Sequence, residues 1–123
     1  MYKVTVVVPV YNAEQCIERC VRSLFDQTMS DIEYVFVDDC SPDNSIAILD
    51  RLLEEYPERA RSTKIIRHEK NTGQSGARRD GMLVATGDYI IHCDADDWVE
   101  PDMYQSMYEK AESEGVEAVC CEI

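Results

Sequence analysis

The chain has 123 residues, 45% of them hydrophobic, and a formal net charge of −13. This length provides one domain with a real core and is too short for two, so we expect a single domain over residues 1–123. The negative charge argues against nucleic acid or an anionic membrane as a partner, because either would be approached against long-range repulsion.

The sequence alternates between strand patterns and helix patterns. β-Branched runs indicate the strands, and apolar residues three or four positions apart indicate the helices. Asn12 and the Ser41-Pro42 pair should begin the first two helices, Pro57 should stop the second, and Pro101 and Gly115 should begin and end the last. In chain order, the predicted elements are a strand over residues 4–8, a helix over 12–27, a strand over 32–37, a helix over 41–56, a strand over 64–68, a helix over 75–85, a strand over 88–93, a helix over 101–114 and a strand over 116–121.

Strands that alternate with helices predict an α/β fold. The crossovers should be right-handed, which gives a mostly parallel sheet with helices on both faces, and the wholly apolar first strand should lie centrally. In such sheets ligands bind beyond the carboxyl ends of the strands. Four polar segments follow predicted strands and should meet at this edge: Pro9-Val10-Tyr11-Asn12, Asp38-Asp39, Asn71-Thr72-Gly73 and Asp94-Ala95-Asp96-Asp97.

Three carboxylates lie within four positions after the fourth predicted strand. Asp94, Asp96 and Asp97 would repel one another without a cation among them, so the cluster suggests a divalent metal site. Asp96 could bind Mg²⁺ or Mn²⁺, and the metal would neutralise a diphosphate leaving group. Asp94, on the same side of an extended segment, could accept hydrogen bonds from a ribose hydroxyl or a metal-bound water. Alternatively, these acids cap the turn before Pro101, and for Asp97 both interpretations stay open.

Two other residues at the same edge suit recognition of a nucleobase. Asp39 can accept a hydrogen bond from an N–H of a uracil or guanine edge, and Tyr11 offers an aromatic face. Asp39 could instead cap the loop that follows it, and Asp38 should point away from the edge.

Residues 71–79 combine two glycines, a helix start and two arginines. Backbone amides and one guanidinium could face a phosphate there. Helical spacing cannot put Arg78 and Arg79 on one face, so we expect Arg79 on the solvated surface. His68 and His92 are isolated from each other and from any cysteine pair, and we expect both to be ordinary strand residues.

No apolar run approaches the ~18 residues of a membrane helix, so we expect a cytoplasmic protein. The six cysteines form no C-x-x-C pattern, which fits reduced thiols in a reducing compartment.

Four blocks, which together cover nearly the whole chain, carry a family resemblance. They are Val6-Val7-Val8-Pro9-Val10-Tyr11-Asn12, Val37-Asp38-Asp39-Cys40-Ser41-Pro42-Asp43, Asn71-Thr72-Gly73 with Ala77-Arg78, and Gly87-Asp88-Tyr89-Ile90-Ile91 running into Asp94-Ala95-Asp96-Asp97 and Pro101. In order and spacing they resemble the family 2 glycosyltransferases of the GT-A fold, a Rossmann-like architecture. The resemblance implies an inverting, metal-dependent transferase that moves a sugar from a nucleotide-diphosphate sugar, expected to be a UDP-sugar, to a glycan or other hydroxyl acceptor.

The same resemblance assigns the site residues. Asp94 and Asp96 would form the catalytic D-x-D motif, with Asp96 as the metal ligand. Two positions depart from the family pattern: Cys40 stands where glycine is usual, and Asp80 where asparagine is usual. The residues that would bind the nucleotide sugar are Pro9, Val10, Tyr11, Asn12, Glu14, Asp39, Asn71, Thr72, Gly73, Arg78, Asp94 and Ala95.

In this family the acceptor site and the general base lie on later segments. We therefore expect the chain to be the nucleotide-binding half of a longer transferase, truncated after the D-x-D strand and inactive or weakly active alone. Asp97 is a poor candidate for the base, because it lies beside the metal site. Any association with a membrane surface would come from segments beyond Ile123.

Three other functions deserve comparison. A phosphoryl-receiver module would need an acidic pair after the first strand, which here ends in Pro-Val-Tyr-Asn. A dinucleotide-binding oxidoreductase would need G-x-G-x-x-G at the same place. A non-catalytic domain that binds a sugar nucleotide for regulation or assembly remains an alternative to the transferase.

Overall fold

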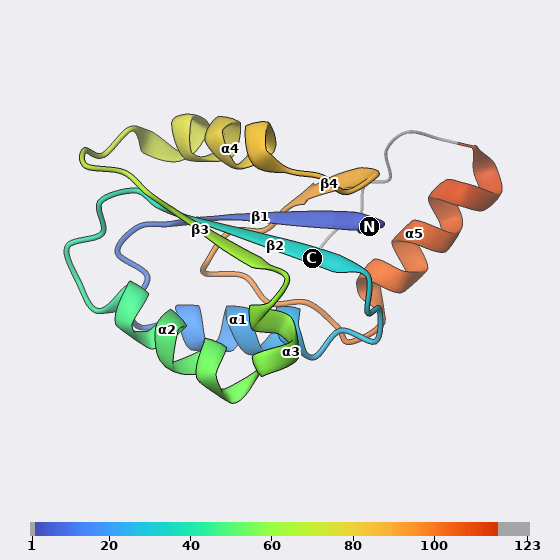
Figure 1. The fold of residues 1–123 in the computed structure, drawn as a ribbon, viewed down its shortest axis with the longest axis horizontal. Coiled ribbons are helices and arrows are strands. Elements are labelled where there is room, and N and C mark those ends of the chain that lie inside the picture. Colours follow the sequence, from blue (N-terminus) through green and yellow to red (C-terminus); the bar gives the residue numbers. More distant parts are fainter. Residues whose placement is uncertain (1, 116–123) are drawn as a thin grey trace.

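Four parallel strands lie at the centre of the fold, with helices on both sides (Figure 1). The computed structural model describes residues 2–115, and its strands are β1 (Val4–Val10), β2 (Ile32–Asp38), β3 (Thr63–Arg67) and β4 (Tyr89–His92). Their order in the sheet is β3-β2-β1-β4, and each neighbouring pair runs parallel. The predicted α/β class and parallel sheet are confirmed, and β1 is an inner strand, as its apolar sequence predicted.

The described residues form five helices: α1 (Ile17–Phe25), α2 (Ser45–Glu55), α3 (Pro57–Ala60), α4 (Gly73–Val84) and α5 (Met103–Glu114). In Figure 1, α4 covers one face of the sheet, and α1, α2 and α3 cover the other. Helix α5 lies beside the end of the sheet where β1 begins. Because the strands all run in one direction, their carboxyl ends meet at the opposite end, away from α5.

Alternate side chains of the inner strands pack against the two helix layers. On β2, Tyr34 and Phe36 belong to the larger core with α1 and α2, whereas Val35 and Val37 pack with Ala77 of α4. All of these residues are buried, and apolar burial contributes about 25 cal/mol per Å² to stability. The period-2 alternation of the strand therefore fixes which helices lie on which face.

The predicted start of the first helix is wrong. Helix α1 begins at Ile17, not at Asn12. Asn12 has a φ of 52°, outside the conformation of a helix N-cap, and its backbone N–H donates to Ser41 Oγ at 2.8 Å. Asn12 and Gln15 have the spacing of a helix-capping pattern, but here they lie in a loop that is hydrogen-bonded to Ser41.

The second and last helices also begin later than predicted. Helix α2 starts at Ser45 rather than at Ser41-Pro42, and α5 starts at Met103 rather than at Pro101. Gly115 ends α5 in the left-handed conformation, with a φ of 64°, as predicted. The strand predicted over residues 116–121 lies outside the described residues.

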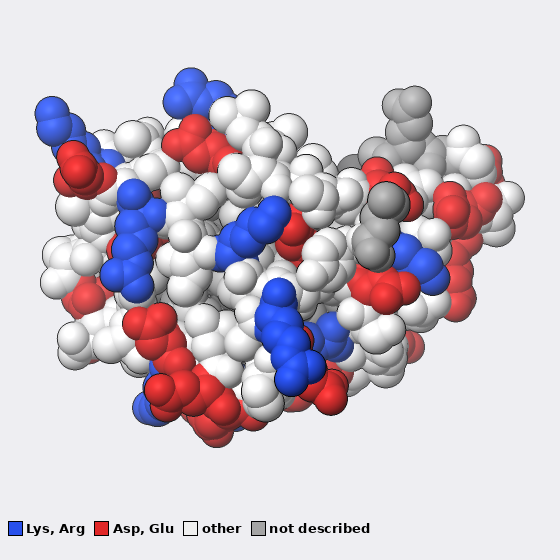
Figure 2. All heavy atoms as spheres, viewed as in Figure 1, with Lys and Arg blue, Asp and Glu red and all other residues white. Residues whose placement is uncertain are grey.

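Figure 2 shows acidic side chains gathered over α2 and over α5. On this face the basic side chains stand apart from one another and form no continuous patch. Among residues 2–115, none of the helices is both long enough and apolar enough to cross a membrane.

Candidate functional site

A cavity of about 390 Å³ opens at the edge of the sheet where β1, β2 and β4 end. This is the edge at which the polar segments were predicted to meet. The predicted residues that line the cavity are Pro9, Tyr11, Asn12, Asp39, Asn71, Gly73, Asp94, Ala95 and Asp96. The predicted residues Val10, Glu14, Thr72 and Arg78 do not line it, while Ala13, Cys16, Gln74 and Ala77 line it without having been predicted.

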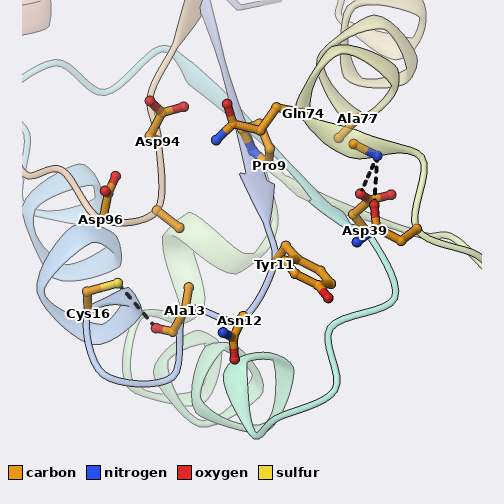
Figure 3. Close-up of a pocket in the computed structure, with 13 residues that line it drawn as sticks. Pro9, Tyr11, Asn12, Ala13, Cys16, Asp39, Gln74, Ala77, Asp94 and Asp96 are labelled. Atoms are coloured by element: carbon orange, nitrogen blue, oxygen red, sulfur yellow. Dashed lines mark hydrogen bonds between the residues drawn. The ribbon is translucent and has the colours of Figure 1, made fainter.

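The two sides of the cavity differ in chemistry (Figure 3). Asp94 and Asp96 lie on one side, on the segment after β4, and Asp39 lies on the other side, directly after β2. Tyr11 lies nearer to Asp39, on the loop after β1, and is 49% exposed, so its ring is open to a partner. One side therefore offers carboxylates, and the other offers an aromatic ring with a hydrogen-bond acceptor.

The acidic side of the cavity suits a divalent cation. One carboxylate oxygen from each of Asp94, Asp96 and Asp97 lies within 4.8 Å of the others. The backbone N–H of Asp97 donates to the Asp94 carbonyl at 3.0 Å, a tight turn that brings the side chains together. Burial raises the pKa of Asp97, and the charges of Asp96 and Asp94 raise it further. Three crowded oxygen ligands fit Mg²⁺ or Mn²⁺, which would relieve this repulsion.

Arg78 reaches the acidic side from α4. Its Nη2 donates to Asp94 Oδ1 at 2.7 Å. Its Nε is buried and is the only such side-chain nitrogen or oxygen within residues 2–115 that has no hydrogen-bond partner. Arg78 thus holds one oxygen of Asp94, although Arg78 itself does not line the cavity.

Asp39 is 3% exposed and holds the 71–73 loop in place. Its Oδ1 accepts from the backbone N–H and the hydroxyl of Thr72, and its Oδ2 accepts from the Gly73 N–H, each at 2.8 Å. The ring of His68 lies 2.8 Å from the same Oδ1. Burial raises the pKa of Asp39, but the hydrogen bonds from His68, Thr72 and Gly73 outweigh it, and the pKa is lowered overall. Asp39 therefore caps the 71–73 loop, which follows β3, and not the loop that directly follows Asp39 itself. Its Oδ2 accepts one hydrogen bond from the protein and can accept another.

Asp43, which the sequence did not single out, joins the loops after β1 and β2. Its carboxylate accepts from the hydroxyls of Ser41 and Ser45, at 2.7 and 2.6 Å, and from the backbone N–H of Glu14, at 3.0 Å. Burial raises the pKa of Asp43, but these donors lower it to about 2. Ser45 Oγ in turn accepts from the Ala13 N–H at 2.9 Å. The only sequence signal was the run of short polar residues at alternate positions 41, 43 and 45.

Glu14 was predicted to line the nucleoside pocket, and its side chain instead contacts Asn44, the residue before α2. Its Oε1 accepts from Asn44 Nδ2 at 3.0 Å. Glu14 contributes its backbone N–H to the network around Asp43. The residue therefore supports the cavity wall rather than forming it.

The model of the family described as glycosyl transferase family 2 matches residues 5–123. The chain belongs to this family. Uncharacterized glycosyltransferase EpsJ of Bacillus subtilis is 41% identical over 118 residues, which cover 96% of the chain and 33% of EpsJ. Cholesterol galactosyltransferase of Borreliella burgdorferi is 32% identical over 119 residues, which cover 97% of the chain and 32% of that protein. The chain thus spans about a third of the length of these relatives.

Solved structures confirm the GT-A fold that the resemblance implied. S. aureus TarS in complex with UDP-GlcNAc superposes with a TM-score of 0.81 at 26% identity, covering 90% of this chain and 31% of TarS. The mannosyltransferase PcManGT from Pyrobaculum calidifontis, in complex with GDP-Man and Mn²⁺, gives a TM-score of 0.72 at 27% identity, covering 80% of this chain and 29% of PcManGT.

Cys40 departs from the glycine that is usual in family 2 glycosyltransferases. Its φ of 61° lies in the left-handed region, which glycine adopts without strain and other residues do not. Its exposed thiol donates to the Glu69 carbonyl at 3.5 Å. Cys40 thus adopts, in the turn after β2, a backbone conformation that favours glycine.

Two buried thiols contact the segment that carries Asp94 and Asp96 from the core. Cys20 on α1 and Cys93 after β4 each lie 3.6 Å from the carbonyl oxygen of Asp94. Cys16, Cys20, Cys40 and Cys93 are all free thiols, and the other two cysteines lie outside the described residues.

Proposed function

We propose that the chain binds a nucleotide-diphosphate sugar, specifically a UDP-sugar, together with Mg²⁺ or Mn²⁺. The observation that carries the proposal is the placement of Asp94 and Asp96 across one cavity from Tyr11 and Asp39. A nucleotide diphosphate needs both kinds of surface, one for its phosphates and one for its base. The complexes of TarS with UDP-GlcNAc and of PcManGT with GDP-Man and Mn²⁺ support the same ligand class.

The base would lie at the side of Tyr11 and Asp39. The half-exposed ring of Tyr11 can stack on a nucleobase. Asp39 Oδ2 already accepts from the Gly73 N–H and can also accept from the ring N–H of uracil. Asn71 and Gly73, which line the cavity beside them, would complete this side.

The diphosphate would lie at the side of Asp94 and Asp96. Asp96 would hold the metal, with Asp97 close enough to share it. A metal bound there neutralises the diphosphate and so stabilises it as a leaving group. Asp94 keeps one oxygen free of Arg78, which can accept from a ribose hydroxyl or a metal-bound water.

For the reaction, we propose inverting transfer to a glycan or other hydroxyl acceptor, with this chain supplying the donor side. An in-line displacement needs a base that takes the acceptor's proton. Asp97 lies within the carboxylate cluster, where a cation would hold its charge, so we do not assign it this role. None of the described residues is assigned as the base.

Isothermal titration calorimetry with UDP, with and without Mn²⁺, tests the binding proposal. We expect binding that requires Mn²⁺ and that Asp96→Asn weakens at least about tenfold, or ~1.4 kcal/mol, because a charged metal ligand is lost. Asp102→Asn makes the same chemical change at an exposed residue before α5 and serves as the matched control. Metal-independent binding, or wild-type affinity in Asp96→Asn, would contradict the proposal. Titration with GDP under the same conditions measures the preference for uracil.

A further inference from the structure

His68 lies directly after β3, between two carboxylates. Its Nδ1 is 2.8 Å from Asp39 Oδ1, and its Nε2 is 2.7 Å from Asp80 Oδ2 on α4. The side chain is only 11% exposed. Its backbone N–H donates to the Asp38 carbonyl at 2.8 Å, which continues the pairing of β2 with β3 and fixes where the ring sits. The sequence-based expectation of an ordinary strand residue is therefore wrong.

The two contacts require a protonated ring. A neutral imidazole carries one N–H, whereas an ionised carboxylate can only accept, so a neutral ring would leave one carboxylate facing a nitrogen lone pair. The imidazolium donates to both. The hydrogen bond with Asp39 raises the pKa of His68, burial opposes this, and Asp80 raises the pKa further, so that it lies above its ordinary value.

Few other polar groups face this ring. Thr72 Oγ1 lies 3.2 Å from Nδ1 and donates to Asp39. Arg79 approaches Asp80 from outside, with its Nε 3.6 Å from Asp80 Oδ1, and is 75% exposed. The neighbouring Arg67 pairs with Asp50 at 3.9 Å instead. Asp39 and Asp80 are thus the charged groups that decide the state of His68.

The bridge matters because Asp39 carries the loop that lines the cavity. The backbone N–H of Thr72 and the backbone N–H of Gly73 both donate to the Asp39 carboxylate. Gly73 has a φ of +80°, which glycine adopts without strain, so the hydrogen bonds to Asp39 select this conformation among the several that are open to glycine. If the ring loses its proton, Asp39 or Asp80 must turn away from it, and a turn of Asp39 releases the loop.

We propose that protonated His68 is a positioning residue for nucleotide binding, because it joins Asp39 to Asp80 and holds Asp39 against the 71–73 loop. The inference rests on the proposed function, since the nucleotide is the ligand whose binding the bridge supports. Nucleotide affinity should be full while His68 is protonated and should fall as the pH rises through its pKa. Affinity should fall with rising pH because the folded chain stabilises the protonated form of His68, so the support that the bridge gives is lost when the ring loses its proton.

Nuclear magnetic resonance titration of the histidine rings tests the bridge itself. The chain has two histidines, so the variant His92→Gln assigns the resonances. We expect His68 to titrate above the ordinary value for histidine. In Asp80→Asn it should titrate lower, because the introduced amide can donate to Nε2 of a neutral ring. Asp88→Asn, the same change at an exposed residue before β4, should leave His68 unaltered. Titration at or below the ordinary value, or an unchanged value in Asp80→Asn, would overturn the inference.

Calorimetry with UDP and Mn²⁺ across the measured pKa tests the link to binding. Above that pH, the wild-type chain should bind UDP about tenfold less tightly than Asp80→Asn, since one charge-assisted hydrogen bond is lost only in the former. His68→Gln should lose this step in the pH profile. Identical pH profiles for the wild type and Asp80→Asn would show that the bridge does not serve binding. Absence of UDP binding at every pH would instead overturn the proposed function and the binding role of His68 with it, while the ring titration would still report whether the bridge forms.

Discussion

Four donors reach the carboxylate of Asp39, and three of them share Oδ1. This uneven distribution leaves Oδ2 with one protein partner and room for another. Asp39 therefore holds the 71–73 loop with both oxygens and keeps room on Oδ2 for a ligand. Tyr11, in contrast, has an exposed ring that can be truncated without opening a core cavity.

Tyr11→Ala should weaken UDP binding about tenfold and leave stability nearly unchanged. Stacking of a base on an aromatic ring contributes ~1–3 kcal/mol, and Tyr11 is half exposed. Tyr11→Phe keeps the ring and should bind like the wild type. Calorimetry on both variants, with thermal unfolding as the measure of stability, checks this. Equal losses in the two variants would point to the hydroxyl rather than to stacking.

Cys40 provides a test of backbone strain at the residue scale. Its φ of 61° costs a non-glycine residue ~1–2 kcal/mol, and its side chain is exposed, so packing plays little part. Cys40→Gly should therefore be at least as stable as the wild type, and Cys40→Val should be less stable by about 1–2 kcal/mol. Guanidinium unfolding of the three proteins measures the difference. Equal stability of the glycine and valine variants would show that the backbone at position 40 is not strained by a side chain.

Prediction from sequence was most direct where residues that lie together in space are also close in the chain. The Asp94, Asp96 and Asp97 cluster was recognised because three carboxylates lie within four positions. His68 and Asp43 were missed for the opposite reason. His68 contacts Asp39 and Asp80, which lie 29 and 12 positions away, and neither contact leaves a local pattern in the sequence.

The same reason explains the errors at the scale of elements. The strands were placed well, because short runs rich in β-branched and aromatic residues indicate them locally. The starts of α1 and α2 were not, because the preceding residues bind each other: Asn12 N–H to Ser41 Oγ, and Glu14 N–H to Asp43. Short polar residues cap helices or bind distant loops with the same side-chain oxygens, and tertiary contacts decide between the two.

Helix α4 approaches the sheet closely at Gly81. A Cβ at this position would collide with Cγ1 of Val7. Gly81→Ala should therefore destabilise the chain by about 1–3 kcal/mol despite the better helix propensity of alanine. Leu83→Ala, on the exposed side of the same helix, should change stability by less than about 0.5 kcal/mol. Chemical denaturation compares them, and a neutral Gly81→Ala would mean that α4 can move away from β1 at no cost.

At the scale of the whole molecule, the parallel sheet explains how one cavity collects residues from four parts of the chain. The strands deliver Tyr11, Asp39 and Asp94 to the same edge, and the start of α4 brings Gly73, Gln74 and Ala77 there.

We therefore expect the 123-residue chain to bind UDP-sugar and to transfer little or no sugar by itself. The site accounts for the leaving group, and we assign to none of the described residues the role of taking the acceptor's proton. An assay for released UDP with glycan acceptors measures this, with Mn²⁺ present throughout. Robust transfer would contradict the assignment and direct attention back to Asp97.

The central claim is that the acidic side holds a metal-bound diphosphate and that the opposite side holds the base. A crystal structure of the chain with UDP and Mn²⁺ tests it most directly, because anomalous scattering locates manganese independently of the phosphates. The account predicts manganese bound to Asp96, with uracil beside Tyr11 and Asp39. Manganese away from Asp96, or uracil on the side of Asp94, would contradict it.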